Sequence, residues 1–309
     1  MIDALASASH YAAHVGAVLN ALPPESRGQF LDKADDADRP ILTASFGDMK
    51  RAERAGRTRI ALMEHGAGQS YGGRNIHHGS YAGGWGRDAA SLFLHPGNHP
   101  AERDRAAYPG ARVEVVGSPY LDTLPHREGT PDHVVAFTFH FNGAICAETK
   151  TAYPAFFPAI VKLAERYQVI GTAHPNLWNY GRPGKRIADR YRRYGIEPVE
   201  DFHEVSRRSD LLIFDNTSAG FAFAATGRPV VVMNAPWYDR RRQHGLRFWD
   251  AAGVGVNCDE PDDLEACVEE AFRDTDEQKA KREAALDLVY AYRTGASQRA
   301  ADVLMDWAA

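Results

Sequence analysis

The stretch that decides the fold is SDLLIFDNTSAGFAFAATGRPVVVMNAP, residues 209–236. A run of apolar residues leads into Asp215, a helical segment follows and ends at Gly227, and a second apolar run begins at Pro229. Short apolar runs between polar turns predict strands that are buried on both faces. Strand, helix and strand in this order are typical of a parallel α/β sheet.

Three polar residues, Asn216, Thr217 and Ser218, stand between the first of these strands and the helix. Thr217 or Ser218 is suited to cap the helix, and the first backbone N–H groups of a helix attract an anion. Ligands of open parallel sheets bind at the carboxyl ends of the strands. The turn therefore predicts a diphosphate site; the alternative is that these side chains only cap a helix.

The same alternation of strands and helices extends along the rest of the chain. We predict strands at residues 40–44, 59–63, 91–94 and 113–116, and then at 133–139, 168–171, 196–199, 210–214 and 229–233. Helices are expected between them and from residue 262 onward, where apolar residues recur at helical spacing. The opening 22 residues are also expected to form a helix, because they lack the basic start of a signal peptide.

Residues 119–132 are rich in proline and charge and poor in apolar side chains, as in an exposed linker between domains. We therefore expect an α/β protein of two Rossmann-like domains, residues 1–126 and 127–290, each with a doubly wound parallel sheet facing a central cleft. A C-terminal helix, residues 291–309, is expected to pack back on the first domain.

Composition and charge limit the function classes. The 309 residues are 44% hydrophobic and 25% charged with a net charge of −5, so no overall attraction to nucleic acid is expected. The cysteines Cys146, Cys258 and Cys267 form neither a metal-binding pair nor a disulfide framework, which favours the cytoplasm. No apolar run approaches the roughly 20 residues of a membrane span, so any membrane contact would be peripheral.

A second candidate segment is TRIALMEHGAGQSYGG, residues 58–73, where a strand ends in Glu64 and His65 and a glycine-rich loop begins at Gly66. A histidine at a strand's carboxyl end faces the ligand crevice of an α/β domain, and its ordinary pKa lies near neutrality. His65 is therefore a candidate general base, the alternative being a structural histidine beside a tight turn. The loop matches no Walker or G-x-G-x-x-G motif, which argues against P-loop and nicotinamide-dependent enzymes.

A third segment, VIGTAHPNLW at residues 169–178, places His174 just past a strand of the second domain. There it is suited to stabilise a leaving phosphate. The arginine clusters at 190–193 and 207–208 are expected to be solvated faces, whereas the cluster at 240–247 lies beside the predicted diphosphate site.

No metal site is predicted. The neighbours His77 and His78 do not easily face one site together, and a proline and a glycine break the helix that would align His95 with His99.

Taken in order along the chain, these segments resemble the CDP-glycerol glycerophosphotransferases that build teichoic acids, a family of the wider two-domain GT-B glycosyltransferase fold. The resemblance covers roughly residues 58–299, and its strongest motif is SDLLIFDNTS with the residues up to Pro229. Shorter matches are EHGAGQ (64–69), GSPYLD (117–122), AFTFH (136–140), the His-Pro turn at His174 and GASQR (295–299).

The resemblance implies a metal-independent transferase without a cofactor, whose first domain takes the acceptor and whose second domain takes a nucleotide-diphosphate donor. His65 would be the base on the acceptor hydroxyl, and His174 would contact the donor phosphate. Asn216, Thr217 and Ser218 would hold the diphosphate. Further candidates for the cleft are Glu64, Gly66, Asp122, His140, Asp215, Arg242 and Arg247.

Departures from the family's pattern leave the donor open. His140 and Tyr120 stand where the family has arginines, and Ala222 replaces an acidic residue that meets the ribose in related transferases. The basic residue after the His-Gly loop has no counterpart, so the arginines at 240–242 or Arg247 would supply the missing positive charge. A nucleotide sugar and CDP-glycerol are therefore both candidate donors.

The sequence leaves the acceptor open as well: a hydroxyl on a glycan, a wall polymer, a protein or a modified nucleic acid. Two other functions remain as alternatives. One is an enzyme like the UDP-sugar 2-epimerases, for which only Glu64 and Asp122 are positioned as acid/base carboxylates. The other is a non-catalytic module that binds a nucleotide or a glycan.

Overall fold

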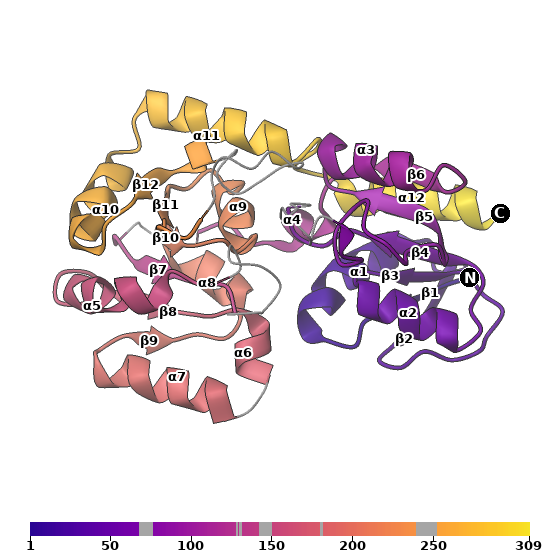
Figure 1. Cartoon of the computed structure of the whole chain (residues 1–309), viewed down its shortest axis with the longest axis horizontal. Helices are drawn as coiled ribbons and strands as arrows, with labels where there is room; N and C mark the ends of the chain where they lie inside the picture. Colours follow the sequence, from indigo (N-terminus) through magenta and orange to yellow (C-terminus); the bar gives the residue numbers. More distant parts are fainter. Residues whose placement is uncertain (68–76, 128, 130–131, 142–149, 180–181, 239–251) are drawn as a thin grey trace. The chain divides into compact units, whose positions relative to one another are not determined.

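The computed structural model describes residues 1–67, 77–127, 129, 132–141, 150–179, 182–238 and 252–309 (Figure 1). Among these, Met1–Thr123 and Asp287–Ala309 form one compact unit, and residues 124–286 form a second. Each unit contains a six-stranded sheet. All neighbouring strands in both sheets run parallel.

In the first unit the strand order is β2-β1-β3-β4-β5-β6. The strands are β1 Ile2–Leu5, β2 Arg27–Leu31, β3 Ile41–Thr43, β4 Ile60–Met63, β5 Ala90–His95 and β6 Arg112–Val115. The helices are α1 Ser9–Ala21, α2 Phe46–Arg54, α3 Asn98–Ala107, α4 Pro119–Thr123 and α12 Ala296–Ala308.

Side chains of β4 alternate between two cores on opposite faces of this sheet. Ala61 and Met63 pack in the core that holds α1 and α12, whereas Ile60 and Leu62 pack in the core that holds α2. Burial on both faces is what a doubly wound sheet requires, and it explains why β4 is apolar at every position.

The C-terminal helix α12 completes the first unit. It contacts α1 and α4, and Ala300, Ala301 and Leu304 are fully buried among residues of α1 and the sheet. The Ser297 backbone N–H at the start of α12 donates to Oδ2 of Asp122 in α4 at 2.6 Å. A carboxylate at a helix N-terminus is favourable, so Asp122 anchors this end of α12.

In the second unit the strand order is β12-β11-β10-β7-β8-β9. The strands are β7 Val135–Phe137, β8 Val169–Gly171, β9 Glu197–Pro198, β10 Leu211–Phe214, β11 Val230–Met233 and β12 Val256–Cys258. The remaining helices are α5 Tyr153–Leu163, α6 Pro175–Asn179, α7 Arg182–Arg193, α8 Phe202–Arg208, α9 Ala219–Ala224, α10 Leu264–Arg273 and α11 Asp276–Val289.

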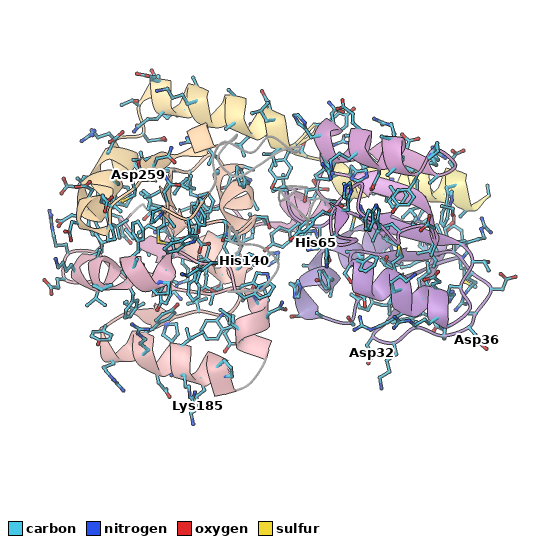
Figure 2. All side chains as sticks on the ribbon, in the orientation of Figure 1. Asp32, Asp36, His65, His140, Lys185 and Asp259 are labelled. Atoms are coloured by element: carbon cyan, nitrogen blue, oxygen red, sulfur yellow. The ribbon has the colours of Figure 1, made fainter. Side chains whose placement is uncertain are left out.

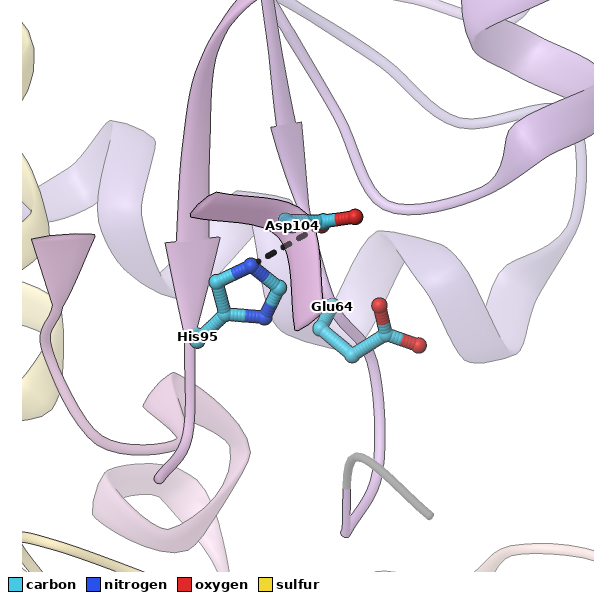
Figure 3. A group of neighbouring side chains, drawn as sticks. All are labelled: Glu64, His95 and Asp104. Atoms are coloured by element: carbon cyan, nitrogen blue, oxygen red, sulfur yellow. Dashed lines mark ion pairs between the residues drawn. The ribbon is translucent and has the colours of Figure 1, made fainter. Parts of the chain in front are cut away.

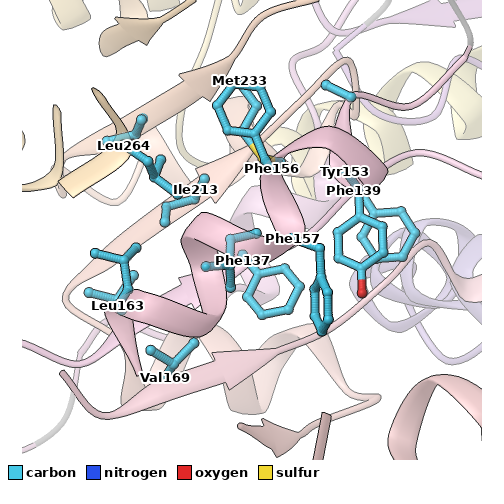
Figure 4. Packing of buried hydrophobic residues seen from close by; sticks show 14 of the residues in the cluster. Phe137, Phe139, Tyr153, Phe156, Phe157, Leu163, Val169, Ile213, Met233 and Leu264 are labelled. Atoms are coloured by element: carbon cyan, nitrogen blue, oxygen red, sulfur yellow. The ribbon is translucent and has the colours of Figure 1, made fainter. Parts of the chain in front are cut away.

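Aromatic side chains join α5 to β7 and the residues after it (Figure 4). The rings of Phe139 and Tyr153 are stacked with centroids 3.9 Å apart, and Phe137 meets Tyr191 edge to face at 5.1 Å. Aromatic pairs of this kind add to the free energy of burial. They hold the carboxyl end of β7 in place.

The predicted fold class is confirmed: both units are α/β with doubly wound parallel sheets. The prediction for the opening residues was wrong. Ile2–Leu5 is strand β1, and only Ser9–Ala21 is helical. β1 has four residues, which is too short for its period to be seen, and it is a strand because it pairs with β2 and β3. The edge strands β2 and β12 were not predicted at all, because neither is an uninterrupted apolar run.

The segment at residues 119–132, expected to be a linker throughout, begins with helix α4. The change from the first unit to the second follows Thr123. Among the described helices, none combines the length and the apolarity needed to cross a membrane.

Candidate functional site

The carboxyl end of β4 carries the first predicted site residues. His65 is half-buried, and its ring lies 4.9 Å from that of Tyr11 and 6.1 Å from that of His14, both on α1. Gly66 has φ of +74°, a left-handed conformation that favours glycine and turns the chain away from the strand. The structure thus places His65 at the end of a strand in the interior of the sheet.

The environment of His65 favours the neutral imidazole. Burial lowers the pKa of His65, Glu64 and a hydrogen bond to the Ala44 backbone oppose this, and Arg87 acts in the same direction as burial. The net pKa lies below the ordinary value for histidine. A neutral ring at neutral pH is the form that accepts a proton.

The sequence interpretation missed the residues around His65. His10, Tyr11 and His14 come from the first turns of α1, and Tyr120 of α4 stacks on His14 at 4.9 Å. Burial, together with nearby His65, lowers the pKa of His10 to about 4, against the influence of Asp48. The spacing of SHYAAH was visible in the sequence, but it points to a site only once β1 is known to precede α1.

Four buried side chains of the first unit, Glu64, Arg87, His95 and Asp104, form a polar network that begins next to His65 in the sequence; Figure 3 shows three of them, Glu64, His95 and Asp104. Nη2 of Arg87 donates to Glu64 at 3.1 Å, and Nη1 donates to Asp104 at 3.0 Å. Nε2 of His95 lies 3.0 Å from Oδ2 of Asp104. Although burial acts to raise it, the contacts with His95, Arg87 and the Gly83 N–H hold the pKa of Asp104 below its ordinary value.

Three members of this network, Glu64, His95 and Asp104, have ligand atoms close enough to hold a metal ion. The sequence interpretation had paired His95 with His99 and had no reason to consider Asp104. A cation would have to displace the guanidinium of Arg87, which already pairs with both carboxylates. The arrangement is therefore better suited to hold the strand end and α3 together than to bind a metal.

In the second unit, Asp215 lies directly after β10 and organises the neighbouring strand end. Oδ1 accepts from the backbone N–H of His140 at 2.8 Å, and Oδ2 accepts from the Thr151 hydroxyl at 2.6 Å and from the Ala152 N–H at 3.3 Å. Burial raises the pKa of Asp215, while Thr151 and His140 oppose it. Asp215 therefore joins the carboxyl ends of β10 and β7 to the start of α5.

His174 follows β8, the neighbour of β7, and is fixed in orientation. Its backbone N–H donates to the Phe139 carbonyl at 3.1 Å, and its Nδ1 accepts the backbone N–H of Asn176 at 3.2 Å. The ring lies 5.4 Å from that of His140 and 4.5 Å from that of Phe141. Because Nδ1 is an acceptor, the proton of the neutral ring is on Nε2, which is thus a donor.

The predicted diphosphate turn lies at the carboxyl end of β10. Asn216 and Thr217 are buried and Ser218 is half-buried. Ser218 occupies the N-cap position of α9, yet its side chain makes no capping hydrogen bond. Ser218 thus stands at the start of the helix, as predicted, but its hydroxyl does not cap the helix.

Other predicted residues are placed as follows. Asp122 is used at the N-terminus of α12, as described above, and His140 lies beside His174. Arg242 and Arg247 lie outside the described residues. The structure places His140 after β7, His174 after β8 and the residues 215–218 after β10, and these three strands are neighbours in the sheet of the second unit. It places His65 after β4, a strand of the first unit.

Residues 158–305 match the family model of the CDP-Glycerol:Poly(glycerophosphate) glycerophosphotransferases. This confirms the family resemblance. The matched range contains His174 and the turn at 215–218, but it begins after His65. The chain matches none of the curated proteins searched.

The fold is similar to that of solved GT-B enzymes. A variant of the wall teichoic acid polymerase TagF soaked with CDPG superposes with a TM-score of 0.64 at 12% identity, over 99% of this chain and 87% of that one. The S. aureus MnaA–UDP co-structure has a TM-score of 0.61 at 12% identity, over 98% and 94%. A UDP-N-acetylglucosamine 2-epimerase has a TM-score of 0.62 at 13% identity, over 99% of this chain and 95% of that one.

At these identities the structural likeness shows the GT-B fold alone. The match to the glycerophosphotransferase family adds support for a transferase that uses a nucleotide donor.

Proposed function

We propose that this protein transfers a glycosyl or glycerol-phosphate group from a nucleotide-diphosphate donor to a hydroxyl of an acceptor. The observation that carries the proposal is the family match over residues 158–305, because it includes His174 and the predicted diphosphate turn. These residues follow β8 and β10, which both neighbour β7 in the sheet. The acceptor is proposed to be a glycan, a wall polymer, a protein or a modified nucleic acid.

We propose His65 as the general base. Its lowered pKa keeps the imidazole neutral at neutral pH, so it can take the proton of the acceptor hydroxyl as the oxygen attacks the donor. With a nucleotide sugar, the oxygen attacks the anomeric carbon and the nucleoside diphosphate leaves. With CDP-glycerol, it attacks the phosphorus that bears glycerol and CMP leaves.

The donor phosphates are proposed to lie against the strand ends of the second unit. The Nε2–H of His174 supports this role, because the bond from Asn176 to Nδ1 leaves Nε2 as the donor. Asn216, Thr217 and Ser218 add amide and hydroxyl donors, and donors of this kind offset charge on a leaving phosphate. Asp215 is proposed to shape the turn without touching the donor.

We further propose that transfer needs no metal ion or cofactor. Among the described residues, Glu64, His95 and Asp104 have metal-ligand spacing, but both carboxylates already pair with Arg87. Transfer that persists unchanged in excess EDTA, after dialysis against the chelator, is the expected result.

The test begins with thermal unfolding in the presence of CDP-glycerol, CDP, UDP, GDP and common nucleotide sugars. A donor at 100 times its Kd stabilises the fold by roughly 2.7 kcal/mol, and we expect one nucleotide class to do so. The shift should disappear in a Thr217→Ala, Ser218→Ala double variant. If no nucleotide shifts the transition, the transferase proposal fails.

A His65→Ala variant separates catalysis from binding. We expect it to keep the nucleotide-induced shift and to lose transfer, while a His99→Ala variant, at an exposed position of α3, keeps both. Undiminished transfer in His65→Ala would remove His65 from the mechanism. A wild type that binds but never turns over with any acceptor would favour the non-catalytic module.

The 2-epimerase alternative has less support in this chain. Its two candidate carboxylates are engaged, Glu64 with Arg87 and Asp122 with the backbone N–H of Ser297. Incubation with UDP-N-acetylglucosamine in D₂O, without an acceptor, distinguishes the two activities. An epimerase would exchange the hydrogen of the inverted carbon, and we expect no deuterium in the recovered sugar.

A further inference from the structure

Four rings from two helices gather around His65. His65 follows β4 and lies beside α1 at the edge of the first unit (Figure 2). The Tyr11 ring meets it edge to face at 4.9 Å and lies 4.0 Å from the ring of His10. The His14 ring lies 6.1 Å from that of His65, and Tyr120 of α4 stacks on His14 at 4.9 Å with an interplanar angle of 25°. We call these five residues the ring cluster.

The scaffold of the first unit fixes the positions of these rings. His10, Tyr11 and His14 lie within one turn of α1, and residues three and four apart on a helix are neighbours on its surface. α1 is held on the sheet by the buried side chains of Val15 and Val18, and it contacts α4, which carries Tyr120. Side chains presented by packed helices hold a ligand more precisely than side chains on loops.

The ring cluster is open to a ligand. His10, Tyr11, His65 and Tyr120 are half-buried, whereas His14, on which Tyr120 stacks, is buried. Sites for small molecules are lined mainly by apolar and aromatic side chains, with a few polar groups that fix the orientation of the ligand. Phenol and imidazole groups provide both kinds of surface, so the cluster has the composition of a ligand site.

The charges that act on the cluster are already paired. The pKa of His10 is about 4 and burial lowers the pKa of His65, so both imidazoles are uncharged at neutral pH. Arg87, the cation that acts on the pKa of His65, pairs with Glu64 and Asp104.

The same holds beside His10. Asp48 acts on the pKa of His10, and its carboxylate pairs with Arg51 at 2.7 Å. Each of the two arginines, Arg87 and Arg51, is thus matched by a carboxylate. In the described part of this site, an anionic acceptor would therefore lose its hydration without gaining either of these cations as a partner.

We propose that Tyr11 and Tyr120 select an acceptor whose reacting end is an uncharged sugar ring. This inference rests on the proposed function, in which His65 takes the proton of the acceptor hydroxyl. A pyranose has a face of C–H groups that packs on an aromatic ring, and hydroxyls at its rim that bond to phenol and imidazole groups. Of the acceptors proposed above, the ring cluster therefore favours a glycan.

Stacking also explains how the acceptor hydroxyl is positioned. Because the ring of Tyr11 contacts that of His65, a sugar held on Tyr11 presents its rim hydroxyls next to the base. Glycerol phosphate has no flat apolar face to stack in this way. Its charge is also not offset by the described residues of the cluster.

The experiment measures binding by saturation-transfer NMR on the full chain, with CDP or UDP present and absent. The probes are methyl β-glucopyranoside, methyl N-acetyl-β-glucosaminide and glycerol phosphate. We compare the wild type with Tyr11→Leu and Tyr120→Leu, which keep an apolar side chain but lose the flat ring. The control is Tyr194→Leu, which removes an exposed ring of the second unit. Thermal unfolding checks that each variant is folded.

We expect the wild type to bind a glycoside more tightly than glycerol phosphate. The Kd of the glycoside should rise about threefold to tenfold in Tyr11→Leu and in Tyr120→Leu, the range expected for one aromatic contact, and by less than about twofold in the control. All variants should keep the nucleotide-induced thermal shift, because the donor is proposed to bind the second unit.

Two further measurements locate the sugar. The imidazole NMR signals of His14 and His65 should shift when the glycoside is added, whereas that of His99, at an exposed position of α3, should not. Tyr120→Arg places a guanidinium beside His14, so it should weaken glycoside binding and strengthen binding of glycerol phosphate.

Equal glycoside affinities in the wild type and both tyrosine variants, or no glycoside binding by the wild type with either nucleotide present, would overturn the inference. Tighter binding of glycerol phosphate than of either glycoside would also overturn it and indicate a charged acceptor. The proposed function fails on a different result, the absence of any nucleotide-induced shift. Glycoside binding at the ring cluster would then identify a sugar site that has no part in transfer.

Discussion

At the scale of single residues, the pKa of His65 depends on the buried ion pair of Arg87 and Glu64. Removing Arg87 leaves the Glu64 carboxylate uncompensated, which favours a protonated His65 and raises its pKa. For Arg87→Met we expect the acid limb of the pH–rate profile to move to higher pH by about 0.5–1 unit. Glu64→Gln removes the opposing negative charge, so that limb should move to lower pH.

The two opposite shifts distinguish an electrostatic role from general damage. NMR titration of the His65 imidazole gives the same information without turnover. Arg87→Met should also lower the free energy of unfolding by about 3–5 kcal/mol, because it leaves an unpaired buried charge. Arg112→Met, which removes the solvent-accessible ion pairs of Arg112 with Glu114 and with Asp306 of α12, is the control and should move neither quantity measurably. Shifts in the same direction for both network variants would show that the pair does not set the charge at His65.

At the scale of elements, the turn from β10 to α9 depends on glycine at position 220. A Cβ there would lie 2.2 Å from the ring of Phe214. Gly220→Ala therefore forces α9 away from β10, at an expected cost of about 1–3 kcal/mol in denaturant unfolding. The nucleotide-induced stabilisation should weaken with it, since Thr217 and Ser218 precede the displaced helix.

A glycine with space around it provides the comparison. A Cβ added at Gly253 would lie 3.9 Å from its nearest neighbour, the Lys281 carbonyl oxygen, so Gly253→Ala should change stability by no more than about 0.5 kcal/mol. A Gly220→Ala variant as stable as Gly253→Ala would mean that the helix start tolerates displacement.

At the scale of the whole molecule, the first unit is completed by the last residues of the chain. Leu304 of α12 is fully buried against α1 and the sheet, whose residues come much earlier in the sequence. Leu304→Ala should cost about 2–5 kcal/mol, and hydrogen exchange should accelerate at β1 and β3 more than at β7 and β10. Asp302→Ala, at an exposed position of the same helix, should leave exchange unchanged. Uniform acceleration in both sheets would show that the two units unfold together.

Local pattern determined most of the architecture. Apolar runs bounded by polar turns identified the strands that precede His65, His174 and the turn at 215–218, because burial on both faces of a parallel sheet leaves such runs in the sequence. The alternation of strand and helix then required a doubly wound sheet. Since ligands bind at strand ends in this fold, the candidate site residues followed from position alone.

Only the tertiary structure decided which residues meet. β1 is a strand because it pairs with β2 and β3, and this pairing places His10, Tyr11 and His14 around His65. The bonds of Arg87 to Glu64 and Asp104 span 23 and 17 residues, and that of Asp122 to Ser297 spans 175. Arg208 of α8 pairs with Glu197 of β9, which lies 11 residues earlier in the sequence. Contacts between segments far apart in the sequence produce no periodic pattern in it. These long-range partners could therefore be identified only from the tertiary structure.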